Sequence, residues 1–235
     1  MKKFKSFIAL DLNSNAKNIK IVKKLYRHVY GFKVGYRSFY NKQSNDLISE
    51  IKKTKCKLFL DLKLHDIPNT VSSAIDSLSK INPDFLTLHV SGGEEMMKAA
   101  VKCLRKNKFK TKILGVTLLT SLDGKDSKKI YKEEDSKKLV KKFAEIANKV
   151  KLHGLICSGN ELTALKKFTK LIKVTPGVKL FSRSDDQKRV TFAHNALENG
   201  ASFVVIGREL IENKEPIDLL NKYAEQHKNK NLWTK

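Results

Sequence analysis

Three charged side chains at the end of one apolar segment could carry out chemistry together. Residues 58–70, LFLDLKLHDIPNT, begin as an apolar run and then place Asp61, Lys63 and Asp66 within six residues. Residues two apart on a strand point to the same face, so we expect Asp61 and Lys63 side by side. Nearby carboxylates favour the protonated form of a lysine. An ammonium held beside a carboxylate suits a reaction that creates a carbanion and then protonates it.

A second lysine joins this cluster from the preceding apolar run. Lys33 lies in the run GFKVGY and can reach the same face from a neighbouring strand. Buried charges are costly unless they are paired, so alternating lysine and aspartate charges would satisfy one another without a metal. The spacing leaves two alternatives open: a purely structural ion-pair network, and ligation of magnesium by Asp61 and Asp66.

Short apolar runs that could position these residues recur along the whole chain. They are rich in β-branched and aromatic residues and are flanked by turn residues or charges, which predicts strands. The eight predicted strands cover residues 6–12, 31–36, 57–63, 84–90, 112–120, 154–158, 171–177 and 203–208.

Helical patterns lie between these runs. Apolar residues recur at helical spacing in 15–29, 69–81 and 137–150, and helices are also expected at 160–169 and 216–227. Strands that alternate with helices are typical of a parallel sheet. Eight such units in 235 residues predict an α/β fold, a (β/α)₈ TIM barrel, as a single domain over 1–235. An open doubly wound sheet is the alternative, which the absence of a Gly-rich fingerprint after the first strand disfavours.

Polar residues follow most of the predicted strands, where active sites of such barrels lie. The loops after the seventh and eighth strands form the usual phosphate site, and an arginine fork matches phosphate geometry. The residues at strand ends are Asp11, Lys33, Asp61, Lys63, His89, Thr120, Ser121, Ser158, Thr175, Pro176, Gly177, Gly207 and Arg208.

Composition limits the remaining classes of function. The net charge of +24 reflects a lysine bias spread through the chain more than a nucleic-acid surface, and it is compatible with attraction of an anionic substrate. No apolar run reaches the ~18 residues of a membrane span. Asp11 interrupts the short N-terminal apolar stretch, so we do not expect a signal peptide. Three cysteines without paired spacing disfavour a disulfide framework or a zinc site and fit a cytoplasmic protein.

The order of motifs resembles the orotidine 5′-monophosphate decarboxylase family, in its bacterial form. ALD stands in the first strand, FKVG in the second, DLKLHDIPNT from the third, TPG in the seventh, DDQKR in the loop that follows and IGR in the eighth. The resemblance runs from Ala9 to Arg208. It implies decarboxylation of orotidine 5′-monophosphate to UMP and CO₂, the last step of UMP synthesis, without a metal or an organic cofactor.

The resemblance also assigns roles to residues. It implies that Lys63 protonates C6 of the pyrimidine, that Asp61 faces the leaving carboxylate and that Lys33 positions Asp61 and contacts the ribose. It further implies that Asp11 binds a ribose hydroxyl, and that Asp66, Ile67 and Thr70 complete the site of the neighbour in a homodimer. Contacts to the base and phosphate are implied for Thr120 or Ser121, Pro176, Gln187, Gly207 and Arg208.

One position departs from the family pattern. The usual PGIR after the seventh strand is PGVK here, so Lys179 stands in place of arginine and lacks its planar fork, with Arg183 as a possible substitute.

Two rival functions remain: a magnesium-dependent decarboxylase or aldolase of sugar phosphates, and a basic nucleic-acid-binding protein. The HDIPNT and DDQKR segments disfavour the first, and the lack of a recognisable nucleic-acid module disfavours the second.

Overall fold

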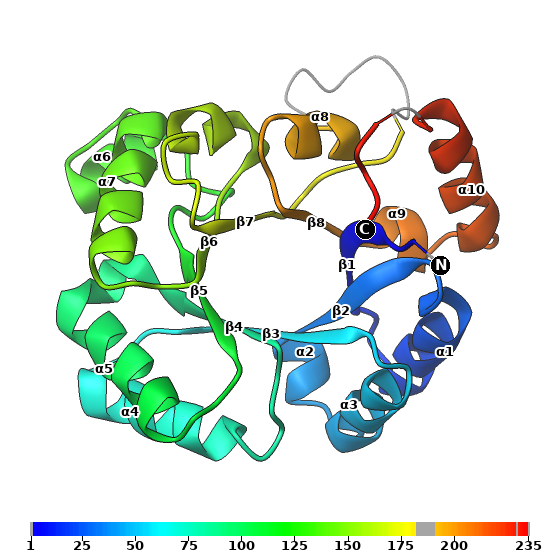
Figure 1. Ribbon diagram of the computed structural model, residues 1–235, viewed down its shortest axis with the longest axis horizontal. Helices are drawn as coiled ribbons and strands as arrows, with labels where there is room; N and C mark the ends of the chain where they lie inside the picture. The colour runs from blue at the N-terminus through cyan, green and yellow to red at the C-terminus, as the bar shows by residue number, and fades with distance from the viewer. Residues whose placement is uncertain (1, 182–190, 229, 235) are drawn as a thin grey trace. The chain divides into compact units, whose positions relative to one another are not determined.

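Eight parallel strands form a closed barrel in chain order (Figure 1). The computed structural model describes residues 2–181, 191–228 and 230–234. The closed barrel confirms the predicted (β/α)₈ fold and excludes an open doubly wound sheet. The strands are β1 (Phe4–Ala9), β2 (Val29–Gly35), β3 (Lys57–Leu64), β4 (Phe85–His89), β5 (Lys112–Val116), β6 (Gly154–Ile156), β7 (Ile172–Thr175) and β8 (Phe203–Ile206).

Helices follow the strands along the chain. Their bounds are α1 (Asn15–Leu25), α2 (Tyr36–Phe39), α3 (Ser44–Lys53), α4 (Pro68–Leu78), α5 (Gly93–Lys106), α6 (Gly124–Tyr131), α7 (Ser136–Lys149), α8 (Ala193–Glu198), α9 (Arg208–Ile211) and α10 (Pro216–Gln226), with 3₁₀ helices η1 (Val90–Gly92) and η2 (Gly159–Leu165).

The chain forms two compact units, one of Met1–Asp61 with Thr175–Lys235 and one of Leu62–Val174. The single domain over 1–235 stays a prediction.

Several predicted elements differ in extent or type, and three of the differences are informative. The helix expected over 15–29 ends at Leu25, because Val29 already begins β2. The strand expected over 112–120 ends at Val116. The α-helix expected over 160–169 is the 3₁₀ helix η2, where Ser158 and Glu161 form a reciprocal capping box. Short connectors of this kind commonly adopt 3₁₀ geometry.

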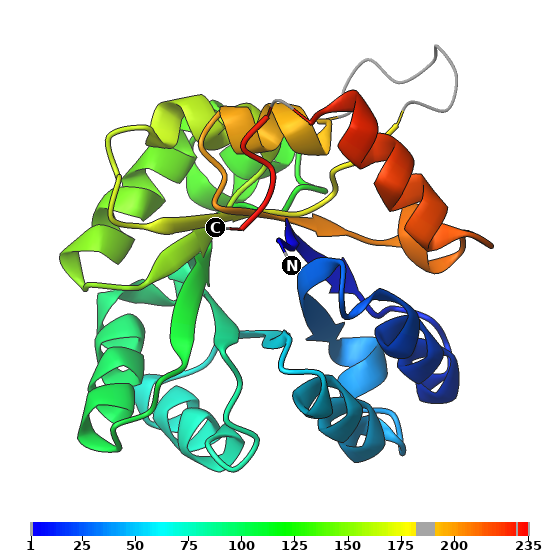
Figure 2. The ribbon, with the colours of Figure 1, turned by 45° about the vertical axis from the view of Figure 1, so that its right-hand side comes forward.

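The first unit places two charged residues on neighbouring strands. Lys33 of β2 is paired with Phe59 of β3, and Gly35 is paired with Asp61. Phe7 of β1 packs edge-on against Phe59, with ring centroids 5.2 Å apart. This apolar packing fixes the strands whose ends carry the charges. Helices α1 and α3 of this unit lie side by side in both Figure 1 and Figure 2.

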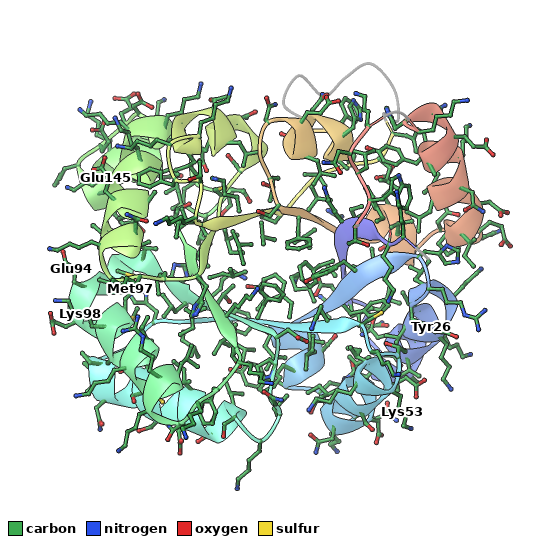
Figure 3. All side chains as sticks on the ribbon, viewed as in Figure 1. Tyr26, Lys53, Glu94, Met97, Lys98 and Glu145 are labelled. Carbon is green, nitrogen blue, oxygen red and sulfur yellow. The ribbon has the colours of Figure 1, made fainter. Side chains whose placement is uncertain are left out.

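The second unit has an outer surface on which lysines pair with glutamates. Lys149 of α7 lies 2.9 Å from Glu94 of α5, and Lys167 lies 2.9 Å from Glu145. Figure 3 labels Glu94 and Glu145 on these helices, while Met97 of α5 is fully buried. Exposed pairs of this kind contribute little to stability but neutralise part of the positive charge. They agree with our interpretation that many lysines belong to solvated helix faces.

Candidate functional site

In the first unit, Lys33 lies between two carboxylates. Its Nζ is 3.3 Å from Oδ2 of Asp61 and 3.8 Å from Oδ1 of Asp11. The side chains of Lys33 and Asp61 are only 11% and 13% exposed, whereas that of Asp11 is 48% exposed. Strand pairing explains this arrangement, because Lys33 is paired with Ala9 of β1 on one side and with Phe59 of β3 on the other. The expected proximity of Lys33 and Asp61 is therefore present.

Gly35 leaves room above this charged pair. A Cβ at this position would lie 3.3 Å from Nζ of Lys33 and 3.6 Å from Oδ1 of Asp11. The adjacent Tyr36 is exposed, and its pKa is raised by partial burial and then by the negative charge of Asp61. The ends of β2 and β3 therefore form a polar, partly solvated surface in which a carboxylate is held close to an ammonium.

In the second unit, Lys63 occupies an unusual backbone conformation for a strand residue. It lies in β3 with φ of 43°, in the left-handed region that non-glycine residues rarely adopt. Its N–H donates to Oγ1 of Thr87 in β4 at 2.8 Å. Because the backbone is not extended at Lys63, alternation along the strand does not fix the direction of its side chain. The expectation that Lys63 shares a face with Asp61 stays a prediction.

The residues just past β3 are exposed. Oδ1 of Asp66 accepts a hydrogen bond from the N–H of Ile67 at 2.7 Å, and Pro68 begins α4. Ile67 is 65% exposed although it is a large apolar residue, and Thr70 in the first turn of α4 is exposed too. The exposed Ile67 beside a carboxylate is compatible with a contact to another chain.

Two further predicted residues lie in the loop between β5 and α6. Because β5 ends at Val116, Thr120 and Ser121 follow the strand by several residues and are exposed. The expectation that β5 itself ends at Thr120 and Ser121 is therefore wrong. Their contact with a base stays a prediction, now assigned to a loop.

The residues predicted to hold phosphate lie on two segments of the first unit. Gly177 after β7 has φ of 69°, a conformation that favours glycine, and it follows the half-buried Pro176. Gly207 precedes α9, and Arg208 is its exposed first residue. The N–H of Lys179 donates to the carbonyl of Thr191 at 3.1 Å. Gln187 and Arg183 lie outside the described residues.

A carboxylate that the sequence reasoning missed joins these two segments. Oε2 and Oε1 of Glu209 accept hydrogen bonds from the N–H groups of Leu180 at 2.7 Å and Phe181 at 3.0 Å. Glu209 follows Arg208, and Leu180 follows Lys179, so these two hydrogen bonds fix the backbone next to both basic residues. A glutamate directly after IGR is the only sequence signal for it, and its partners could not be predicted.

The described residues lack a metal-binding cluster and a membrane-spanning helix. Within ranges 2–181, 191–228 and 230–234, no three histidine, cysteine, aspartate or glutamate side chains gather as a metal site would require. Across the same ranges, every helix is too short or too polar to traverse a lipid bilayer.

Comparisons with known proteins show which family and which named proteins this chain is similar to. Residues 5–223 match the family described as "Orotidine 5′-phosphate decarboxylase / HUMPS family". A protein of Staphylococcus aureus (strain Mu3) named orotidine 5′-phosphate decarboxylase is 38% identical over 226 residues, which cover 93% of this chain and 96% of that protein. One of the same name from Erythrobacter litoralis is 38% identical over 212 residues, 89% and 93% of the two chains.

Solved structures with the same fold are also similar in sequence. An orotidine 5′-phosphate decarboxylase from Lactobacillus acidophilus has a TM-score of 0.78 and 29% identity, covering 95% of this chain and 99% of that one. An uncharacterized conserved protein from Geobacillus kaustophilus has a TM-score of 0.77 and 26% identity, covering 94% and 98%. Since the family match spans nearly the whole chain and relatives reach 38% identity, the chain belongs to the orotidine 5′-phosphate decarboxylase / HUMPS family.

Proposed function

We propose that this protein is a carboxy-lyase that converts orotidine 5′-monophosphate to UMP and CO₂, the last step of de novo pyrimidine nucleotide synthesis. The observation that carries the proposal is the nearly buried pair of Lys33 in β2 and Asp61 in β3, 3.3 Å apart. Lys63 lies in the same strand as Asp61. A family match over residues 5–223 and relatives that bear this name support the reaction.

Lys63 is the proposed proton donor. Loss of CO₂ leaves an electron pair on C6 of the pyrimidine, and the ammonium of Lys63 stabilises this developing charge and then protonates the carbon. Asp61 faces the carboxylate that leaves. Lys63 sits two residues beyond Asp61 in β3, and a strained backbone such as its φ of 43° is often found at functional sites.

Lys33 and Asp11 are proposed to position the charges and the ribose. Lys33 holds Asp61 in place and contacts the ribose, and the more exposed Asp11 accepts a hydrogen bond from a ribose hydroxyl. The 3.3 Å and 3.8 Å separations from Nζ of Lys33 support this division of roles. Asp66 completes the charged network, and neither a metal nor an organic cofactor takes part.

The other end of the nucleotide is proposed to bind on the loops after β5, β7 and β8. An arginine fork matches phosphate geometry, and an overall positive charge attracts an anionic substrate. The exposed Arg208 at the start of α9 supports this placement. The proposed contacts to base and phosphate are Thr120, Ser121, Pro176, Lys179, Gln187, Gly207 and Arg208.

We also propose a cytoplasmic homodimer in which Asp66, Ile67 and Thr70 reach the site of the partner. The 65% exposure of Ile67 supports an interface there, because a large apolar side chain gains from being covered. Neither a membrane nor a nucleic acid is part of this proposal.

The experiment that tests the reaction uses orotidine 5′-monophosphate and a chelator. Loss of the orotate ultraviolet absorbance with UMP as product is expected, and Lys63→Ala should abolish it while leaving the circular dichroism spectrum unchanged. Lys55→Ala is the matched control, because Lys55 also has a positive φ, 58°, but follows helix α3. A folded protein that leaves the substrate intact, yet acts on sugar phosphates once magnesium is restored, would contradict the proposal.

A further inference from the structure

A threonine lies in the most apolar part of β4. Thr87 is 0% exposed and stands between Leu86 and Leu88, each 1% exposed. A buried hydroxyl is unfavourable unless it forms hydrogen bonds, and valine has nearly the same shape without this requirement. Threonine is therefore favoured over valine at this position only if its hydroxyl forms a hydrogen bond with a neighbouring group.

That partner is the backbone of Lys63. The N–H of Lys63 donates to Oγ1 of Thr87 at 2.8 Å, a normal distance for a hydrogen bond. Both residues belong to the unit Leu62–Val174, so the contact lies within one compact unit. A valine at position 87 would remove the acceptor from this N–H.

The conformation of Lys63 makes the contact important. Among the residues that the structure describes, six non-glycine residues have positive φ, and five of them follow helices, namely Lys55, Asn82, Lys108, Lys132 and Lys151. Such positions after a helix are common places for a left-handed residue. Lys63 alone among these six lies inside a strand, where the left-handed conformation is unfavourable and persists only if surrounding contacts hold it.

We propose that Thr87 is a positioning residue, whose hydroxyl holds the Lys63 backbone in its left-handed conformation and so directs the ammonium toward the reacting carbon. This inference rests on the proposed function of Lys63 as the proton donor. Thr87 acts on the reaction through Lys63 and does not touch the substrate. A small error in the direction of the ammonium affects the transition state more than substrate binding, because the proton is needed only as charge develops on the carbon.

Two substitutions separate the hydroxyl from the shape of the side chain. Thr87→Val removes the acceptor and keeps the volume, and it should lower kcat about 10- to 100-fold, the order expected for a small misplacement, while KM changes little. Thr87→Ser keeps the hydroxyl and should retain most of kcat. Thr111→Val is the matched control, because buried Thr111 donates to the carbonyl of Pro83 at 2.7 Å, before β5 begins.

Amide hydrogen exchange at Lys63 gives a readout that is independent of activity. The Lys63 N–H should exchange slowly in the unmodified protein and in Thr87→Ser, and faster in Thr87→Val. Full kcat in Thr87→Val, or equal losses in the valine and serine variants, would overturn the inference, as would unchanged exchange at Lys63. If the unmodified chain does not decarboxylate the substrate, the proposed function fails by itself, and the exchange rates alone decide whether Thr87 holds Lys63. If Thr87→Val does not fold, the serine variant and its exchange rate decide.

Discussion

Nζ of Lys33 lies 3.3 Å from Oδ2 of Asp61, and both side chains are almost withdrawn from solvent. A charge in such a position has lost most of its hydration, so each of the two charges is stabilised in part by the other. Lys53, labelled in Figure 3, provides a contrast: it lies 3.9 Å from Glu50, and its own side chain is 71% exposed although that of Glu50 is only 19% exposed.

Removing the ammonium of Lys33 should therefore cost stability. Lys33→Met removes the ammonium that lies 3.3 Å from the carboxylate of Asp61 and should lower the free energy of unfolding by about 1–3 kcal/mol. Lys53→Met, the control, should change it by less than about 0.5 kcal/mol. Urea unfolding of both variants, and of Lys33→Met combined with Asp61→Asn, measures the coupling. Equal losses in the free energy of unfolding for Lys33→Met and Lys53→Met would show that the buried pair stabilises the fold no more than the pair of Lys53 and Glu50.

A second prediction concerns stability, and it rests on lysines that follow helices and have a left-handed backbone conformation. Lys108 and Lys151 have φ of 55° and 61° and follow α5 and α7. Glycine adopts this conformation without strain, so Lys108→Gly and Lys151→Gly should each raise the free energy of unfolding by about 0.5–1 kcal/mol. Lys102→Gly inside α5 should lower it by about 1 kcal/mol. A shift of the urea midpoint in the same direction for all three would contradict this explanation.

His153 makes stability depend on pH. Burial, followed by the charges of Lys112 and Arg105, lowers the pKa of its imidazole below the ordinary value of 6.5. Nδ1 of His153 accepts a hydrogen bond from the N–H of Ile113 at 3.1 Å, and an imidazolium has no acceptor to offer. Since the unfolded chain binds this proton more readily, the contribution of His153 is fully present above pH 6.5 and decreases as pH falls below that value.

His153→Gln tests this dependence. The urea midpoint of the unmodified protein should fall more steeply between pH 7 and pH 5 than that of the variant, because the variant lacks the imidazole whose pKa is lowered by folding. His194 and His227, whose pKa values are also lowered chiefly by burial, are present in both proteins, so the difference between the profiles isolates His153. Parallel profiles would assign the acid sensitivity to other groups.

Glu209 should influence substrate binding through the two segments that it joins. Glu209→Gln places an NH₂ group against one of the two backbone donors, and it should cost about 1–3 kcal/mol of stability. If Lys179 and Arg208 bind phosphate, KM for orotidine 5′-monophosphate should rise, while turnover of orotidine, which has no phosphate, should not change. The exposed Glu212 supplies the control Glu212→Gln. An equal effect on both substrates would assign Glu209 to the fold alone.

Much of the barrel could be predicted from the sequence because its strands are short apolar runs that recur along the chain and alternate with helical patterns. The Lys33–Asp61 pair could be predicted too, because charges in such runs need partners. The helix α5 was not among the predicted helices, although its buried residues Met96, Met97 and Val101 recur at a spacing that a helix would give.

The conformation of Lys63 could not be predicted in this way. The N–H of Lys63, whose φ is 43°, donates to a hydroxyl 24 positions further along the chain, and no local pattern links Lys63 to Thr87. The hydrogen bonds from the N–H groups of Leu180 and Phe181 to Glu209 could not be predicted for the same reason, since they join residues 28 or more positions apart. Long-range contacts between a side chain and a backbone group leave no periodic signal in the sequence.

The proposed exchange of residues between subunits can be tested by mixing two inactive variants. Lys63→Ala removes the proton donor of its own site, and Asp66→Ala removes a residue lent to the partner. In a mixed dimer, the chain with Lys63 receives Asp66 from the other chain, so one of the two sites is complete. Random assortment of equal amounts should restore about a quarter of the activity.

A second mixture shows whether the recovery has this cause. Lys33 is proposed to act in the same subunit as Lys63, so mixing Lys63→Ala with Lys33→Ala chains leaves both sites of the mixed dimer damaged. This mixture should recover no activity. Subunit exchange is followed independently, with a mass tag on one of the variants. No recovery from Lys63→Ala with Asp66→Ala after verified exchange would place Asp66 in its own subunit, and the exposed Ile67 beside it would then need another explanation.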